Sequence, residues 1–344
     1  MKNRFIYFAI ATVVAFFIYS CNDDKGSTIT ADQVAAADTE IIRYDHGVGV
    51  SESRTEYLNS YPRLSTILFR HIVGVDQSDS IIFRAGIDEF LDAEVTSNIR
   101  MLIDSVYEDS KKIESDWKDA MSLYQHYFPE RSIPRLYTLQ SNLAIANFVF
   151  EDVDNRDAVA ASLDFFLGKA YPYTGLAQEN PAFSEYNNRT FNPDHLITKS
   201  VSAVLDDLVP EPLEDNFLHL MIREGKKLFL LEKLCPHLPD SAIYAYTPDQ
   251  LAWCELNEFE IWNFFLESEL TYETSIPVIR KYMEPAPTSQ GMPPAAPGRT
   301  APFIGKKIIE AYLRKKPGTD LKFLVDNLDA QQILTESKYK PRSK

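Results

Sequence analysis

The side chains able to carry chemistry are few in this chain, and their spacing argues against the common catalytic sites. Six histidines are scattered along it, and no two of them lie three or four residues apart: His46, His71, His126, His195, His219 and His237. This spacing excludes a zinc site that takes two histidines from successive turns of one helix. The HExxH, Gly-x-Ser-x-Gly, P-loop, dinucleotide-binding and CxxC motifs are also absent from the sequence. We therefore predict that the protein holds no metal and no cofactor.

One carboxylate is placed where a functional group would be. The pattern from Asp215 to Leu234 predicts a helix, and Glu224 falls inside its apolar stripe, which is formed by Phe217, Leu220, Met221, Leu228 and Leu231. A buried carboxylate needs a partner or has a raised pKa, because burial disfavours its charged form. The alternative is a glutamate at the edge of the stripe that reaches water or a lysine. Gly225 beside it would allow another backbone to approach closely.

Two of the three cysteines fall in apolar helical stretches. Cys235 and Cys254 form either a disulfide, which an oxidising compartment permits, or two buried free thiols. Neither has a histidine or lysine at a spacing that would make it a nucleophile. Both alternatives give these cysteines a structural role.

The third cysteine, Cys21, ends a short export signal. Basic residues near the N-terminus precede an apolar and small-residue run from Phe5 to Tyr19, and Ile18-Tyr19-Ser20-Cys21 has the character of a lipobox. The run is shorter than the roughly 20 residues that a helix needs to cross a bilayer. We therefore predict that residues 1–20 are a cleaved lipoprotein signal peptide. Lipidation of Cys21 would then anchor the protein to a bacterial membrane.

The composition after Cys21 indicates how the protein meets its surroundings. Residues 22–39 are rich in Asp, Ser, Thr, Ala and Gln and include no aromatic residue, so residues 21–39 are predicted to be a flexible tether. The whole chain has 35 Lys and Arg against 50 Asp and Glu, a formal charge of −15. This charge repels phosphate backbones and anionic lipids, which excludes nucleic acid as a partner. Contact with the membrane should therefore come from the lipid alone.

Residues 40–344 are expected to form a single domain of the α+β class that is mainly helical. Helices are predicted at 85–112 and 115–127. Three β-branched and aromatic runs follow at 135–139, 144–151 and 158–168, and polar turns separate them. They predict a small antiparallel sheet, which is followed by a helical bundle.

The helices after the predicted sheet have clear boundaries. Asn192-Pro193-Asp194 predicts a helix start, and this helix must end before Pro210. One face of the helix carries polar side chains at intervals of four, three and four residues: His195, Lys199, Ser202 and Asp206. Thr247-Pro248-Asp249-Gln250 fits a capping box and predicts another start. Residues 285–303 hold six prolines and two glycines and therefore predict an irregular loop.

Several short segments, taken in order, resemble one family. They are Leu136-Tyr137-Thr138-Leu139, Leu163 to Gly168, Asp194 to Ile197, Glu224 to Leu228, Ile261-Trp262, Pro285-Ala286-Pro287, Pro297-Gly298-Arg299, Ile304-Gly305 and Ser337 to Pro341. Their order and their spread from the lipobox to the C-terminus resemble the GldB family of gliding-motility lipoproteins. The resemblance implies a membrane-associated lipoprotein of Bacteroidetes that serves gliding and is linked to type IX secretion.

The same resemblance implies a distant, degenerate relationship to zincin-type predicted proteases, which carry HExxH on a helix after a small sheet. His195 then falls at the first histidine, Leu196 at the general base, Lys199 at the second histidine and Glu224 at a later acidic ligand. The base and one ligand are lost, so the resemblance implies a zincin-like domain without catalysis. A pair between Lys199 and Glu224, joined by His195, is expected in place of a metal.

The predicted function is that of a non-catalytic, membrane-anchored lipoprotein of the cell envelope, on the periplasmic face or the cell surface. It would act in gliding motility and type IX secretion as a scaffold or docking component. The expected partners are the membrane, through the lipid, and other envelope lipoproteins or gliding and secretion components. Two alternatives stay open: an envelope hydrolase with an unrecognised active site, and a surface lipoprotein that binds a glycan or peptide. The cleft between the strands and the helices from 193 and 215 is expected to serve as the docking surface.

Overall fold

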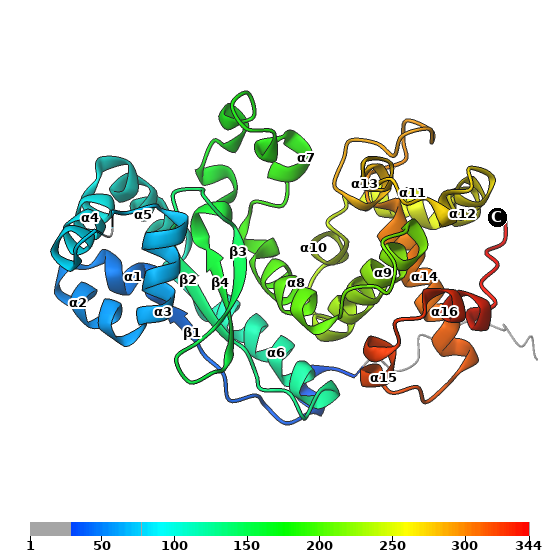
Figure 1. Ribbon diagram of the computed structural model, residues 1–344, viewed down its shortest axis with the longest axis horizontal. Coiled ribbons are helices and arrows are strands. Elements are labelled where there is room, and N and C mark those ends of the chain that lie inside the picture. Colours follow the sequence, from blue (N-terminus) through cyan, green and yellow to red (C-terminus); the bar gives the residue numbers. More distant parts are fainter. Residues whose placement is uncertain (1–28, 77, 344) are drawn as a thin grey trace, which may run out of the picture.

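The computed structural model describes residues 29–76 and 78–343 of the chain. These residues include one four-stranded sheet in the order β1-β2-β4-β3, made of β1 (Ile41–Arg43), β2 (Arg135–Leu139), β3 (Asn147–Glu151) and β4 (Asp157–Ser162). Neighbouring strands β1, β2 and β4 are parallel, and only β3 is antiparallel to its neighbour (Figure 1). The prediction of a mainly helical protein is confirmed. The prediction of an antiparallel sheet is confirmed only for β3 and β4, and the sheet as a whole is mixed. β4 returns between β2 and β3 and is therefore parallel to β2, and the long helical segment 44–134 connects β1 to β2 as a parallel pair.

Helices cover both faces of the sheet. In β2 the side chain of Tyr137 faces one apolar cluster and that of Leu136 faces another, as the period of two in a strand requires. The Tyr137 side packs on the first helices of the chain, which are α1 (Tyr44–Gly49), α2 (Ser51–Ser60), α3 (Pro62–Ser65) and α4 (Ser80–Asp92). The Leu136 side packs on α6 (Lys111–Tyr127) and α8 (Leu196–Leu208). Burial of both faces explains why these strands lack a polar face in the sequence.

The long helix predicted at 85–112 is in fact two helices. The chain breaks at Ala93, whose ψ of 142° is extended, between α4 and α5 (Glu94–Val106). The next predicted helix is confirmed as α6, which ends before Pro129. Neither proline nor glycine marks this break, and the helical pattern of apolar residues continues across it. The sequence therefore predicted a single helix.

The predicted helix starts in the second half of the chain are confirmed. Asn192 Oδ1 accepts a hydrogen bond from the Asp194 amide at 3.1 Å and caps the turn that leads into α8. Thr247 and Gln250 form the predicted capping box of α11 (Pro248–Leu256). The remaining helices are α7 (Glu185–Asn188), α9 (Phe217–Leu234), α10 (Asp240–Tyr244), α12 (Glu258–Glu267), α13 (Ile276–Met283), α14 (Thr300–Lys315), α15 (Leu321–Asp326) and α16 (Ala330–Ser337).

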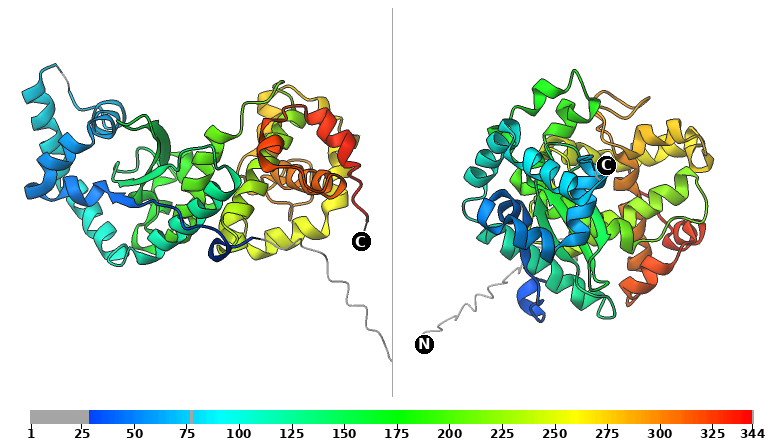
Figure 2. Two further views of the ribbon diagram at one scale, coloured as in Figure 1. Left: turned by 90° about the horizontal axis from the view of Figure 1, so that it is seen from below. Right: turned by 60° about the vertical axis from the view of Figure 1, so that its left-hand side comes forward.

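Two glycines form the crossing point of α9 and α14. A Cβ atom added at Gly225 would lie 2.2 Å from the carbonyl carbon of Gly305, and one added at Gly305 would lie 2.0 Å from the carbonyl oxygen of Met221. The expectation that Gly225 admits another backbone is therefore confirmed, and Gly305 is the partner. This contact ties the second half of the chain together, with α12 to α16 at the end of the molecule opposite α1 to α4 (Figure 2).

The start of the described chain packs on α6. Ala37 is buried, and its amide donates to Ser122 Oγ at 2.9 Å. Trp117 Nε1 donates to Thr39 Oγ1 at 3.1 Å. Residues 29–39, which the sequence assigns to a flexible tether, thus lie on the folded domain, because small side chains let the extended chain approach the helix. None of the described helices is long and apolar enough to cross a membrane.

Candidate functional site

His195 and Leu196 at the start of α8 are buried parts of the fold. The Nδ1 atom of His195 lies 3.1 Å from Asn192 Oδ1, the same oxygen that caps the helix. Burial and the charge of Lys199 lower the pKa of His195 to about 4, so the imidazole is neutral at neutral pH. Leu196 is fully buried in the main apolar core. Both residues therefore position α8.

Glu224 pairs with residues of its own helix and not with His195 or Lys199 of the α8 region. Its Oε1 atom is 2.6 Å from Lys227 Nζ and 3.3 Å from Arg223 Nη1, both on its own helix. The predicted pair between Lys199 and Glu224 is wrong. The alternative of a glutamate at the edge of the apolar stripe, bound to basic neighbours, is the one observed.

The remaining predicted site residues show no reactive arrangement. Cys235 and Cys254 are two separate buried thiols, the second of the two alternatives. Burial raises the pKa of Cys254 to about 12 and also raises that of Cys235. Within residues 29–76 and 78–343, no three His, Cys, Asp or Glu side chains are grouped so that they could hold a metal ion. Cys21, the predicted lipidation site, lies outside the described residues.

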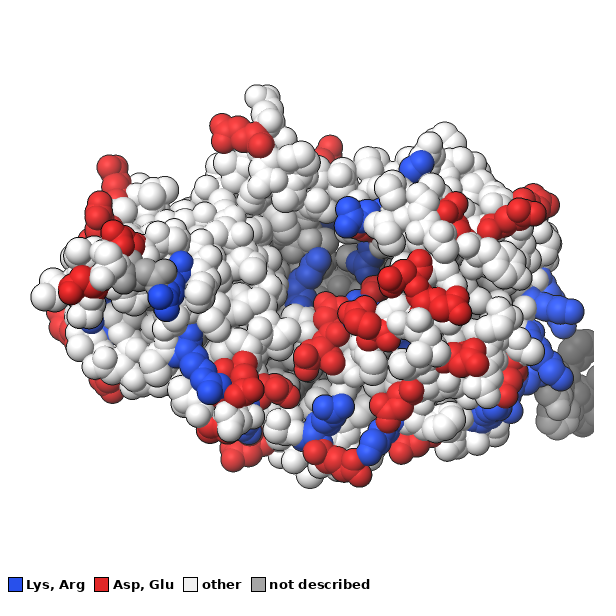
Figure 3. Space-filling view, in the orientation of Figure 1, with Lys and Arg blue, Asp and Glu red and all other residues white. Residues whose placement is uncertain are grey.

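Lys199 lies in a pocket with two arginines. The pocket has a volume of about 140 Å³, and three separate segments supply its basic side chains, Arg189, Lys199 and Arg299. We call it the cation pocket. The rest of its lining includes apolar and aromatic groups, among them Ala182, Tyr186, Phe191, Ala245 and Pro285. Basic side chains gather in the hollow at the centre of the face shown in Figure 3, and acidic ones lie on the surface beside it.

Arg189 is held firmly at one side of the cation pocket. Its Nη1 donates to Gln250 Oε1 at 2.5 Å, and its Nη2 donates to the Ala245 carbonyl at 2.7 Å. Its Nε is buried and has no hydrogen-bond partner. A buried donor without a partner is costly, so this guanidinium has unused hydrogen-bonding capacity.

Arg299 is held at the other side by the proline-rich loop. Its φ of 63° lies in the left-handed region, which is strained for an arginine, and it directly precedes α14. The loop around it is fixed, because Tyr246 Oη donates to the Gly298 carbonyl at 3.0 Å and Ser289 Oγ donates to the Pro297 carbonyl at 2.7 Å. The prediction of an irregular segment is confirmed up to Arg299. The two hydrogen bonds hold this irregular loop in one conformation.

The charges of the cation pocket are not neutralised. Among the described residues, neither Lys199 nor Arg299 forms an ion pair with an acidic side chain. Burial and the charges of Arg299 and Arg189 lower the pKa of Lys199 to about 8, and burial and Arg299 lower the pKa of Arg189. The acid that opposes this effect, Asp206, is itself bound to Lys227. The pocket is therefore preorganised to attract an anion.

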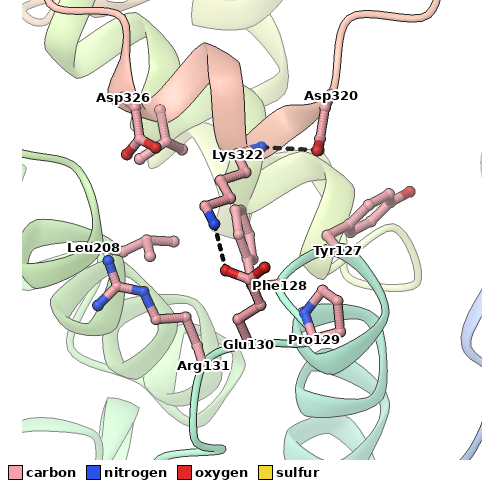
Figure 4. Close-up of a pocket in the computed structure, with 10 residues that line it drawn as sticks. Tyr127, Phe128, Pro129, Glu130, Arg131, Leu208, Asp320, Lys322 and Asp326 are labelled. Atoms are coloured by element: carbon pink, nitrogen blue, oxygen red, sulfur yellow. Dashed lines mark hydrogen bonds and ion pairs between the residues drawn. The ribbon is translucent and has the colours of Figure 1, made fainter.

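A second pocket, at the end of α6, differs in this respect (Figure 4). It has a volume of about 130 Å³ and lies between residues 127–131 and α15. The ammonium of Lys322 crosses it to pair with Glu130, and the Lys322 amide donates to Asp320. Because Lys322 already has an acidic partner, we assign no ligand to this second pocket.

The free edge of β3 lies beside α8. At the two ends of the antiparallel ladder, the Asp152 amide donates to the Arg156 carbonyl and the Ser162 amide donates to the Ala146 carbonyl. The alternation of such a ladder directs the backbone groups of Asn147, Val149 and Glu151 away from β4. The Glu151 carbonyl already accepts a hydrogen bond from Arg63 Nη1. Asn147 and Val149 therefore present backbone groups to an incoming strand, and the side chain of Asn147 donates to Ser200 of α8 at 3.3 Å.

Sequence reasoning found Lys199 but missed Arg189 and Arg299. The three residues are far apart in the chain, and only the tertiary fold brings them together. One signal was available: no acidic residue lies three or four positions from Lys199, so no helical ion pair can neutralise it. Arg299 follows a proline-rich loop and Arg189 lies in a polar turn, and neither context is distinctive.

The fold and the cation pocket define an α+β protein, mainly helical, with an anion-attracting pocket at the start of α8 and a free strand edge at β3. The model of the family described as gliding motility protein GldB matches residues 25–341, and the chain belongs to this family. Membership makes it a gliding-motility-related protein. No curated protein and no solved structure matches the chain.

Proposed function

We propose that the protein is a non-catalytic lipoprotein of the cell envelope that docks polypeptide components of the gliding machinery and of type IX secretion. The side chains of α8 carry this proposal. Leu196 is buried and has no ionisable group to act as a general base, and Lys199, one turn after His195, leaves only one histidine on this side of the helix. A zincin-like ancestry accounts for β3, an antiparallel edge strand beside α8, on which an extended peptide can add as a further strand.

Replacing Val149 by proline is expected to abolish docking. Proline removes an amide that points away from β4, so the strand loses a donor to the partner and keeps its ladder to β4. Val149→Thr is the matched control, because threonine keeps the amide and the β-branched shape. The tagged proteins are purified from membranes of a gliding host, and the proteins that co-purify are identified and compared with gliding of cells that carry each variant.

The expected result is that wild type and Val149→Thr retain the same envelope proteins and support gliding, whereas Val149→Pro does neither although it accumulates normally. Unchanged partners and gliding for Val149→Pro would refute docking at this edge. Chelator-sensitive peptide cleavage by the purified wild-type protein would refute the non-catalytic role and favour the hydrolase alternative.

The lipid anchor gives a separate prediction. Intact-mass analysis of the membrane form is expected to show an acylated N-terminal Cys21, because the apolar run that ends there is too short to span a bilayer. Cys21→Ala is expected to release the protein or block its processing. Recovery of an unmodified chain that begins at Met1 would contradict lipidation.

A further inference from the structure

We propose that the cation pocket binds a carboxylate carried by a polypeptide, namely an acidic side chain of the segment that docks along β3. The polypeptide part of this inference rests on the docking function proposed above. The anion-binding part rests on the pocket alone. The two parts can therefore fail separately.

The need for an anion follows from the groups in the pocket. Lys199 and Arg299 have no acidic partner among the described residues, and Arg189 leaves its buried Nε unused. The protein as a whole is strongly acidic, yet these three cations are kept close enough to repel one another. Repulsion of this kind is relieved when a negative group enters between the cations.

The lining favours an organic carboxylate over an inorganic anion. Guanidinium groups bind carboxylates and phosphates alike, so charge alone does not distinguish them. Apart from the three cations, most of the lining is apolar or aromatic, as at Phe191 and Pro285. Two further residues, Asn187 and Thr190, are polar, and the Thr190 hydroxyl already donates to the Asn187 carbonyl. The apolar groups can pack against the methylene groups of an acidic side chain, whereas a free phosphate needs polar contacts on all sides.

The position of the pocket connects it to the edge of β3. Lys199 is adjacent in α8 to Ser200, whose hydroxyl accepts the hydrogen bond from Asn147 at the start of β3. A segment paired along β3 advances about 3.3 Å per residue and directs alternate side chains to the same face. A segment that pairs at Asn147 would therefore run next to the first turns of α8, which carry Ser200 and Lys199.

The test uses a short alanine peptide with blocked ends and one central glutamate, and compares it with the same peptide carrying glutamine and with inorganic phosphate. Binding to the folded protein is measured by calorimetry. We expect the glutamate peptide to bind at least tenfold more tightly than either other probe. Equal affinity of the two peptides, tighter binding of phosphate, or no measurable binding of any probe would overturn the inference.

Two variants locate the binding. Arg299→Asn removes the guanidinium and keeps a residue that tolerates a positive φ, and Lys199→Gln removes the ammonium. Each is expected to weaken binding of the glutamate peptide about ten- to hundredfold, as the loss of a charged hydrogen bond predicts. Lys281→Gln, which removes an exposed charge from α13, is the control and should leave binding unchanged.

A stability measurement separates binding from folding. Without peptide, Lys199→Gln is expected to unfold at the same or a higher urea concentration than wild type, because it removes repulsion from the pocket. If Lys199→Gln and Arg299→Asn lose stability and peptide affinity in parallel, the residues are structural and the inference is wrong.

The pH dependence gives a further readout. Lys199 faces Arg189 and Arg299, which have the same charge, the neutral His195, and the carboxylate of Asp206. Because burial and the two arginines lower the pKa of Lys199 to about 8, its positive charge is lost as the pH rises through that value. Affinity for the glutamate peptide is expected to fall as the pH rises from 7 to 9 in wild type and to stay level in Lys199→Gln.

The variants also separate this inference from the docking function. If Val149→Pro loses its partners while Arg299→Asn keeps them at full affinity, docking stands and the carboxylate inference fails. If the glutamate peptide binds as expected but Val149→Pro keeps all partners, the pocket stands and docking along β3 fails.

Discussion

Gly305→Ala is expected to lower the free energy of unfolding by about 3 kcal/mol, at the upper end of the usual range for overpacked cores. The added Cβ would lie 2.0 Å from the Met221 carbonyl oxygen and 3.1 Å from the Gly225 Cα. These are backbone atoms of α9, so no side chain can rotate away, and the two helices must separate. Urea denaturation followed by circular dichroism measures the change.

The control for this variant is Gly175→Ala. Gly175 is exposed, has no atom within 4 Å of the added Cβ, and does not have a positive φ. The free energy of unfolding should therefore change by less than about 0.5 kcal/mol. Similar losses at the two positions would show that the contact between α9 and α14 is not close.

Lys306→Met is expected to destabilise the protein by about 3 kcal/mol, because it leaves two carboxylates without their cation. The buried ammonium lies 2.6 Å from Glu232 Oε2 and 2.7 Å from Glu310 Oε1. Burial alone would lower the pKa of Lys306, but Glu310, Tyr244 and Glu232 raise it above its ordinary value. Methionine keeps the apolar packing of the stem, so the loss comes from the charge. Lys315→Met, on the exposed face of α14, is the control and should have little effect.

The cost of Lys306→Met should depend on pH. Burial would raise the pKa of Glu310, but the charges of Lys306 and Lys307 lower it below its ordinary value of 4.5. A carboxyl with a lowered folded-state pKa contributes stability above 4.5, and this stability is lost as the pH falls through the folded-state value. The difference between wild type and variant is therefore expected to shrink below pH 4.5. If the difference in unfolding free energy is constant from pH 3 to 7, the attraction between Lys306 and the Glu310 carboxylate contributes nothing to it.

Local signals in the sequence predicted local structure. Asn192 and the box from Thr247 to Gln250 fix helix starts through hydrogen bonds between near neighbours, so their residue types are sufficient. The strand at 135–139 was found because it is a short β-branched and aromatic run between polar turns. Gly225 predicted a close approach because a glycine inside a helix pattern has few other uses.

Features that join distant segments could not be predicted in the same way. β1 has three residues, too few for a periodic pattern, and its parallel pairing with β2 depends on the helices between them. The partner of Gly225 is Gly305, which the sequence does not connect to it. For Lys199, the sequence predicted a pair with Glu224, and only the fold shows that two arginines lie beside it instead.

The packing of residues 29–39 against α6 limits how far the protein can stand from a membrane. If Cys21 carries the lipid, the chain from Cys21 to Ile29 reaches about 28 Å at most when fully extended. The domain is then held within this distance of the membrane, with its α6 side nearest the anchor. In Figure 1 that segment runs along the lower margin, whereas α7 and the loop before α14, which line the cation pocket, lie along the upper margin. Such an anchor would therefore turn the cation pocket away from the bilayer.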